Sequence, residues 1–126
     1  MNKPVRVPNE IYPIRIAASQ APVVVTVAGK VIATTFKALM LDESSGGRTF
    51  YIPREDVDMA LLKRSEHVTH DPNMGDCAYY SIPAGGARSR DAAWSFEAPL
   101  LATAAIKDYL AFAPNRVDAI IEWPAD

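Results

Sequence analysis

A single hairpin signal constrains the fold of this chain more than any other feature. Two β-branched runs, Val23–Val27 and Val31–Thr35, lie on either side of Ala28-Gly29-Lys30. β-Branched side chains favour extended backbone, and glycine adopts the positive φ that a tight turn between antiparallel strands requires. The segment therefore predicts a β-hairpin, and with it an antiparallel sheet.

Short strands are also predicted along most of the remaining chain. Apart from the hairpin they are the runs IYPIRI at 11–16, FKALML at 36–41, RTFYI at 48–52, EHVTH at 66–70, CAYYSI at 77–82, SRDAAWSF at 89–96 and VDAIIEW at 117–123. Turn-forming residues separate these runs, which is typical of a small β-barrel or sandwich. The fold class we expect is therefore mainly β.

Two segments predict helices. Residues 54–62 place Glu55 and Asp56 in a first turn, where acidic groups favour the helix dipole, and so predict a short helix. Residues 99–112 begin at Pro99, are rich in alanine and leucine, and are followed by Pro114. Proline suits the first turn of a helix and stops a helix after its end, so this segment predicts a C-terminal α-helix.

Length and charge limit the domain organisation and the partners. A chain of 126 residues forms one domain, spanning 1–126, and its polar first residues, 1–10, predict a loose N-terminal arm.

The net charge of −2 and the scattered basic residues argue against nucleic acid or a membrane surface as partner. No apolar run approaches the ~18 residues of a membrane span. One cysteine cannot build a disulfide framework, which favours the cytoplasm. Assembly into a homo-oligomer is left open.

The stretch HVTHDPNMGDCAYYSI at 67–82 concentrates side chains that carry out chemistry. Zinc needs three or four converging ligands, but His67 and His70 point to opposite faces of an extended strand, and no paired C-x-x-C motif is present. We therefore predict no metal and no cofactor. Cys77 is interpreted as a small buried core residue, although His70 across the corner keeps a thiol nucleophile open as an alternative.

A set of polar and aromatic residues remains: Tyr51, Arg54, His70, Tyr79, Tyr80, Arg90, Asp91 and Trp94. Aromatic side chains with a few charges line many concave small-molecule sites. The same residue types also build ion pairs in a β-core, so Arg54 or Arg90 paired with Asp91 is the structural alternative. We expect Trp94 to be largely buried.

Four segments together resemble one known family. They read FYIPREDVDMALL, THDPNMGDCAYYSI, RDAAWSFEAP and IKDYLAFAPNRVDAI, and the likeness extends from about Tyr12 to Glu122. The chain is similar to the DUF427 family of small bacterial and fungal proteins, sometimes labelled nucleotidyltransferase-like, a label that no catalytic motif in this sequence supports. The resemblance implies a small antiparallel β-barrel or tent-like sheet with a helix against it.

The central motif departs from the family pattern. Members typically carry Thr-x-Cys-Pro-Tyr-Lys-Gly, whereas this chain reads Thr69-His70-Asp71-Pro72-Asn73-Met74-Gly75. If the family cysteine is a nucleophile or a ligand, this chain lacks it. The residues that match the family are Tyr51, Pro53, Arg54, Asp56, Gly75, Tyr79, Asp91, Trp94 and Asp118.

Two functional hypotheses follow. The first is a module that binds a partner or a flat or anionic small molecule, with arginine holding an anionic group while rings stack. Its predicted pocket consists of Tyr51, Arg54, His70, Asp71, Tyr79, Arg90 and Trp94. The second is an enzyme in which His70, Asp71 or Asp76 performs acid–base chemistry in the same pocket.

Overall fold

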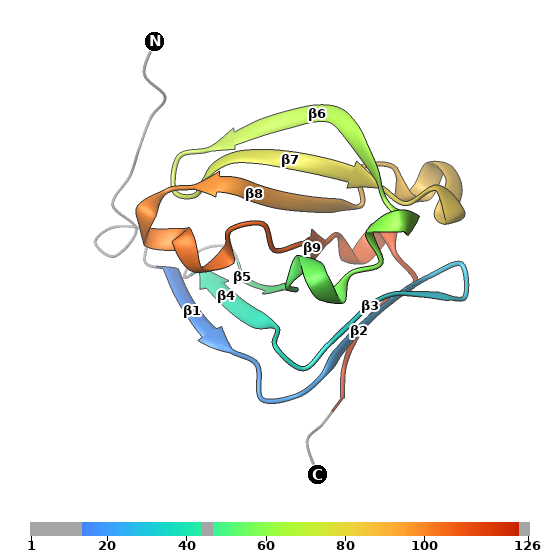
Figure 1. Cartoon of the computed structure of the whole chain (residues 1–126), viewed down its shortest axis with the longest axis horizontal. Helices are drawn as coiled ribbons and strands as arrows, with labels where there is room; N and C mark the ends of the chain where they lie inside the picture. The colour runs from blue at the N-terminus through green and yellow to red at the C-terminus, as the bar shows by residue number, and fades with distance from the viewer. Residues whose placement is uncertain (1–13, 44–46, 124–126) are drawn as a thin grey trace.

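The computed structural model describes residues 14–43 and 47–123 (Figure 1). The strands in this part of the chain are β1 (Ile14–Ala18), β2 (Val23–Val27), β3 (Lys30–Thr35), β4 (Leu39–Glu43), β5 (Gly47–Tyr51), β6 (Lys63–Asp71), β7 (Gly75–Ser81), β8 (Ala93–Pro99), β9 (Ala111–Phe112) and β10 (Ala119–Glu122). Short 3₁₀ turns connect them: η1 (Arg54–Asp56), η2 (Met59–Leu61), η3 (Pro83–Ser89), η4 (Leu101–Ile106) and η5 (Pro114–Arg116). The mainly β fold class is confirmed. The predicted arm at 1–10 lies outside the described residues.

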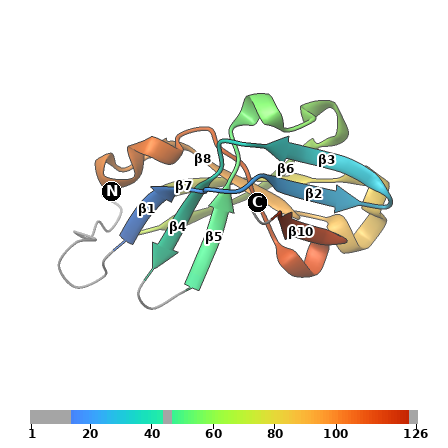
Figure 2. The same cartoon turned by 90° about the horizontal axis from the view of Figure 1, so that it is seen from below.

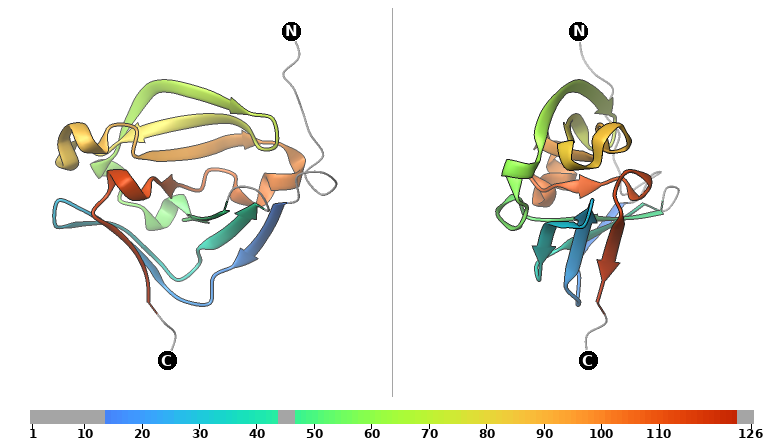
Figure 3. Two further views of the ribbon diagram at one scale, coloured as in Figure 1. Left: turned by 180° about the vertical axis from the view of Figure 1, so that it is seen from behind. Right: turned by 90° about the vertical axis from the view of Figure 1, so that its right-hand side faces the viewer.

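The strands form three antiparallel sheets. Their orders are β1-β4-β5, β10-β2-β3 and β6-β7-β8-β9. The two three-stranded sheets lie side by side, as Figure 2 shows, and the four-stranded sheet covers them from the other side (Figure 3). Within the described ranges the sheets do not close into a barrel, and the tent-like alternative describes them better. No helix among the described residues is long and apolar enough to cross a membrane.

The predicted hairpin is confirmed, and its turn is tighter than the sequence indicated. β2 pairs with β3 from Val27 and Lys30 outward, with a shift of register between Val25 and Thr26. Ala28 and Gly29 both have positive φ, 52° and 75°. Positive φ at both central residues is the turn geometry that follows the natural twist of two strands. Val23, Val25 and Val27 of β2 are buried and alternate with partly exposed neighbours, as the strand period of two requires.

The predicted α-helix at 99–112 is wrong. β8 continues to Pro99, η4 follows as a 3₁₀ segment, and β9 pairs with β8 through Ala93 and Phe112. Leu101 in this segment is 93% exposed. Leu110 instead exchanges two backbone hydrogen bonds of 2.8 Å with Ile52. This tertiary pairing satisfies the backbone and outweighs the helix propensity of alanine and leucine.

The predicted short helix at 54–62 is also wrong, because this segment does not form one continuous helix. The segment forms the separate turns η1 and η2, and Val57 between them has extended backbone and bridges to Ala33 of β3. The N–H of Asp58 donates to the carbonyl of Ile32 at 2.8 Å. Asp56 accepts a hydrogen bond of 2.6 Å from the Thr35 hydroxyl. Contacts with β3 therefore interrupt the helix.

Candidate functional site

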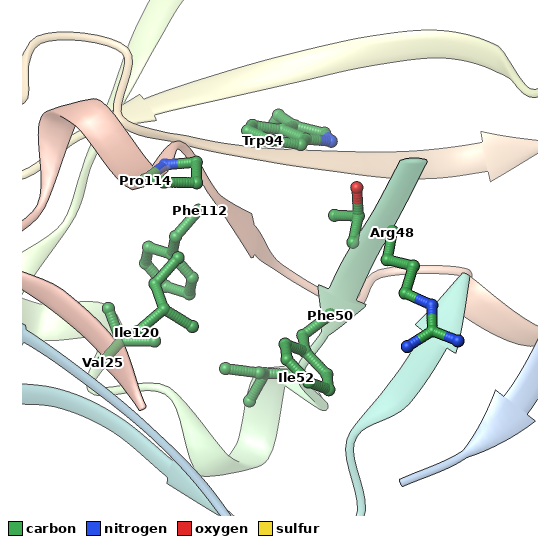
Figure 4. A pocket seen from close by; sticks show the side chains of 9 residues that line it. Val25, Arg48, Phe50, Ile52, Trp94, Phe112, Pro114 and Ile120 are labelled. Atoms are coloured by element: carbon green, nitrogen blue, oxygen red, sulfur yellow. The ribbon is translucent and has the colours of Figure 1, made fainter. Parts of the chain in front are cut away.

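Two hollows lie beside strand β5, which is at the edge of its sheet. Since side chains alternate along a strand, Arg48 and Phe50 lie on one face of β5, and Thr49 and Tyr51 lie on the other. The first hollow, here called the apolar hollow, has a volume of about 310 Å³ and is shown in Figure 4. It is lined by Val25, Arg48, Thr49, Phe50, Ile52, Trp94, Phe112, Pro114 and Ile120.

The second hollow, here called the polar hollow, has a volume of about 270 Å³. It is lined by Glu43, Thr49, Tyr51, Thr69, His70, Asp71, Met74, Cys77, Tyr79, Trp94 and Phe96. Strands β4, β5, β6, β7 and β8 thus supply its walls. Thr49 and Trp94 line both hollows, so the two spaces share these residues as part of their walls.

Trp94 is partly buried and is held between the two layers by a hydrogen bond. Its indole Nε1 donates to the hydroxyl of Tyr51 at 3.2 Å. Tyr51 is only 3% exposed. This hydrogen bond fixes the orientation of the indole. Trp94 lines both hollows. Its side chain is therefore less buried than the sequence predicted.

Burial dominates the electrostatics of the polar hollow. It raises the pKa of the Glu43 carboxyl, and the charge of Asp71 raises it further. Burial also raises the pKa of the Cys77 thiol to about 11. The pKa values of Tyr51 and Tyr79 are raised by burial as well. At neutral pH the thiol is therefore protonated, which argues against Cys77 as a nucleophile and agrees with the predicted buried core residue.

His70 and Asp76 form a pair at the edge of the polar hollow. They face each other across the β6–β7 ladder, and Nδ1 of His70 lies 2.9 Å from Oδ1 of Asp76. A carboxylate at this nitrogen fixes the orientation of the imidazole ring, as in many acid–base sites. Of the three candidate acid–base residues, His70 and Asp71 line the hollow, and Asp76 contacts His70.

Asp71 shapes the turn that follows β6. Its Oδ1 accepts a hydrogen bond of 2.7 Å from the backbone N–H of Asn73. Aspartate forms this local turn readily, because its side chain substitutes for a backbone carbonyl. The residue that replaces the family cysteine therefore has a structural role in addition to lining the hollow.

Five of the seven predicted pocket residues line the polar hollow, and two do not. Tyr51, His70, Asp71, Tyr79 and Trp94 are brought together there. Arg54 and Arg90 line neither hollow.

Arg90 is exposed, and its backbone carbonyl takes part in a hydrogen bond. Its carbonyl accepts a hydrogen bond of 3.1 Å from Arg116. Its neighbour Asp91, the predicted ion-pair partner, has a positive φ of 53°. The Asp91 N–H donates to the Ser81 hydroxyl at 3.0 Å.

Arg54 belongs to a polar cluster on the four-stranded sheet. Its Nη2 lies 3.1 Å from Oε2 of Glu97, so its ion pair is with Glu97 and not with the expected Asp91. Arg64 pairs with Oε1 of Glu97 at 2.9 Å. The Tyr80 hydroxyl donates to Glu97 at 2.6 Å, and the Tyr80 ring lies beneath both guanidinium groups. The pKa of Glu97 is lowered, first by the hydrogen bond from Arg64.

Apart from Trp94, sequence reasoning missed the residues of the apolar hollow, and it missed part of the polar one. Side chains alternate along residues 48–52, so Arg48, Phe50 and Ile52 lie on one face and Thr49 and Tyr51 on the other. This alternation is the signal in the sequence that could have indicated a second lined face. The remaining missed lining residues are Val25, Phe112, Pro114 and Ile120 in the apolar hollow, and Glu43, Thr69, Met74, Cys77 and Phe96 in the polar one. Nothing in their local sequence indicates that they meet.

No group of three or more His, Cys, Asp or Glu side chains within residues 14–43 and 47–123 is arranged to hold a metal ion. Comparison with curated proteins gave no match. A family model described as a domain of unknown function, DUF427, matches residues 15–123. This match covers most of the chain, so the protein belongs to the DUF427 family.

Proposed function

We propose that this protein is a small-molecule-binding module whose ligand occupies the two hollows beside β5. The observation that carries the proposal is that Thr49 and Trp94 line both an apolar and a polar space. Each hollow is close to the lower end of the ~300–1,000 Å³ range of ligand sites, and together they lie within it. Such a shape suits a flat, largely apolar ligand that carries one polar end.

Aromatic rings support the flat part of the ligand. Phe50, Trp94 and Phe112 line the apolar hollow with Val25 and Ile120 around them (Figure 4). Burial of apolar surface contributes about 25 cal/mol per Å², so a ring system of two fused rings is held without any charged contact. Trp94 offers a rigid surface because its Nε1 is held by Tyr51.

The polar end of the ligand occupies the polar hollow and is not held by an arginine. An anionic ligand was suggested by Arg54 and Arg90, but both lie outside the hollows. Arg48 lines the apolar hollow, but it is largely exposed and lies 3.7 Å from Asp42. The module therefore fits a neutral or cationic polar group better than an anionic one.

The proposal is tested by isothermal titration calorimetry with 2-(naphthalen-2-yl)ethanol, a flat neutral probe with one polar end. We expect saturable binding that weakens by about tenfold in Phe50→Ala, because a ring wall is lost. Phe36→Ala is the matched control, since Phe36 is 77% exposed and lines neither hollow. Absence of binding heat, or an equal effect of both variants, would refute the proposal.

An acid–base enzyme is the second candidate, and the 2.9 Å contact between His70 and Asp76 favours it. His70 lines the polar hollow, where it can take a proton from water or substrate. The test is hydrolysis of 4-nitrophenyl acetate by the wild type and by His70→Gln, with His67→Gln as matched control because His67 lies outside both hollows. Loss of the rate in His70→Gln alone supports an enzyme, and equal rates in all three proteins exclude this reaction.

A cytoplasmic location, the lack of nucleic-acid and membrane partners, and an open oligomeric state remain part of the proposal. The single cysteine supports the location, and the net charge of −2 supports the lack of these two kinds of partner.

A further inference from the structure

The polar hollow has an acidic lining. Glu43 at the end of β4 and Asp71 at the end of β6 both line it, and Asp71 acts on Glu43 through its charge. Its lining contains no lysine or arginine, and His70 is its one basic residue. Among the residues that the structure describes, a group that enters this space therefore meets two carboxylates and no lysine or arginine in the lining.

Aromatic rings form much of the remaining wall. Tyr51, Tyr79, Trp94 and Phe96 line the same hollow. The faces of such rings carry partial negative charge and attract ammonium groups within about 6 Å. Carboxylates and ring faces thus favour the same kind of ligand group, a cation.

The Tyr51 hydroxyl adds hydrogen-bonding capacity to the hollow. It is almost completely buried, lines the hollow, and accepts one hydrogen bond from Trp94. Within the described part of the chain it has no second hydrogen-bond partner, although a phenol hydroxyl can make more than one. A ligand group in the hollow could use this remaining capacity.

An organic cation fits this space better than a metal ion. No three metal-ligating side chains converge within the described residues. The Cys77 thiol, with its pKa raised to about 11, stays protonated at neutral pH and is a poor ligand. The volume of about 270 Å³ is also far larger than one coordinated ion needs.

We propose that the polar hollow binds the protonated amino group of an arylalkylamine, whose flat apolar part occupies the apolar hollow. The inference rests on the proposed binding function and adds the charge of the ligand. The ammonium group donates hydrogen bonds to Glu43 and Asp71 and lies against the rings of Trp94 and Tyr79.

Binding of the amine is coupled to pH through the hollow. The raised pKa of Glu43 means that a cation, by favouring the ionised carboxyl, releases protons when it binds. The titratable groups that face Glu43 are Asp71 and His70 from β6, Tyr51 from β5, and Cys77 and Tyr79 from β7. Protonation of the Glu43 carboxyl, whose pKa is raised, weakens the attraction for a cation, so affinity falls as the pH is lowered from neutrality.

The test compares 2-(naphthalen-2-yl)ethylamine with 2-(naphthalen-2-yl)ethanol by isothermal titration calorimetry near pH 7. The two probes share the ring system and differ in the charged group. We expect the amine to bind about tenfold more tightly than the alcohol, as for a charge-assisted hydrogen bond. Glu43→Gln and Asp71→Asn should abolish this preference and leave the affinity for the alcohol almost unchanged. Asp71→Asn keeps an oxygen that can accept the bond from Asn73.

Glu66→Gln is the matched control because Glu66 is exposed on β6, lines neither hollow, and carries the same charge. It should leave the preference for the amine intact. Equal binding of both probes, or equal losses in Glu43→Gln and Glu66→Gln, would overturn the inference while the proposed function stands. Failure of both probes to bind would overturn both.

Discussion

Substitution of Arg54 by alanine should destabilise the fold and leave the hollows unaffected. The Arg54 guanidinium connects β8 to the loop after η4. Its Nε donates to the carbonyl of Asp108 at 3.0 Å, and its Nη2 donates to the Ser95 hydroxyl at 3.1 Å. Its Nη1 donates to the Tyr80 hydroxyl at 3.2 Å. These contacts identify Arg54 as a structural residue.

The size of the effect follows from burial. Ser95 is completely buried, so its hydroxyl loses its partner without access to water. Hydrogen bonds to charged groups contribute about 1.5–3 kcal/mol each, but the Arg54 and Glu97 side chains are 31% and 30% exposed, which screens their ion pair. Arg64 also remains paired with Glu97. We therefore expect Arg54→Ala to lower the free energy of unfolding by about 2–4 kcal/mol.

Urea denaturation at pH 7 measures this loss, with Arg90→Ala as the matched control. Arg90 is exposed and its carbonyl contact with Arg116 survives the substitution, so its loss should stay within about 0.5 kcal/mol. A loss below about 1 kcal/mol in Arg54→Ala, or similar losses in both variants, would refute the reasoning.

The effect of Arg54→Ala should also depend on pH. The pKa of Glu97 is lowered in the fold, chiefly by the hydrogen bond from Arg64 and to a smaller extent by the charge of Arg54. A lowered pKa adds stability above the pKa of the unfolded state, and this stability is lost as the pH falls through the folded-state pKa. The difference between wild type and Arg54→Ala should therefore narrow in acid. A difference that stays constant down to acidic pH would show that the ion pair with Glu97 contributes nothing.

Two further predictions test local features. Cys77, with a thiol pKa of about 11, should react with 5,5′-dithiobis(2-nitrobenzoate) at pH 8 about a hundredfold or more slowly in the folded protein than in urea, and equal rates would show an accessible thiolate. Ala28→Gly should raise the free energy of unfolding by about 0.5–1 kcal/mol, because Ala28 has a φ of 52°. Ala17→Gly in β1 should lower the free energy of unfolding by a similar amount. Changes of the same sign in the two variants, measured by denaturation, would contradict the turn geometry.

The sequence by itself determined those strands whose side-chain pattern and pairing partner both lie within one short segment of the chain. β-Branched alternation and Gly29 specify the β2–β3 hairpin, since its partners are neighbours along the chain. The antiparallel class follows from the same short runs and turns. Five of the predicted pocket residues meet in one hollow because they occupy segments that a small β-fold brings together.

The tertiary structure decided the helices and the partners of charged residues. Helix propensity favoured 99–112, but the backbones of β8 and Ile52 pair with β9 and Leu110, and these hydrogen bonds are not visible in a local window. Arg54 pairs with Glu97, 43 residues away, in place of the expected Asp91. Glu43 and Asp71 reach one hollow from strands of different sheets. Periodicity reports which face of an element is buried, whereas the packing of one sheet on another fixes which side chains meet there.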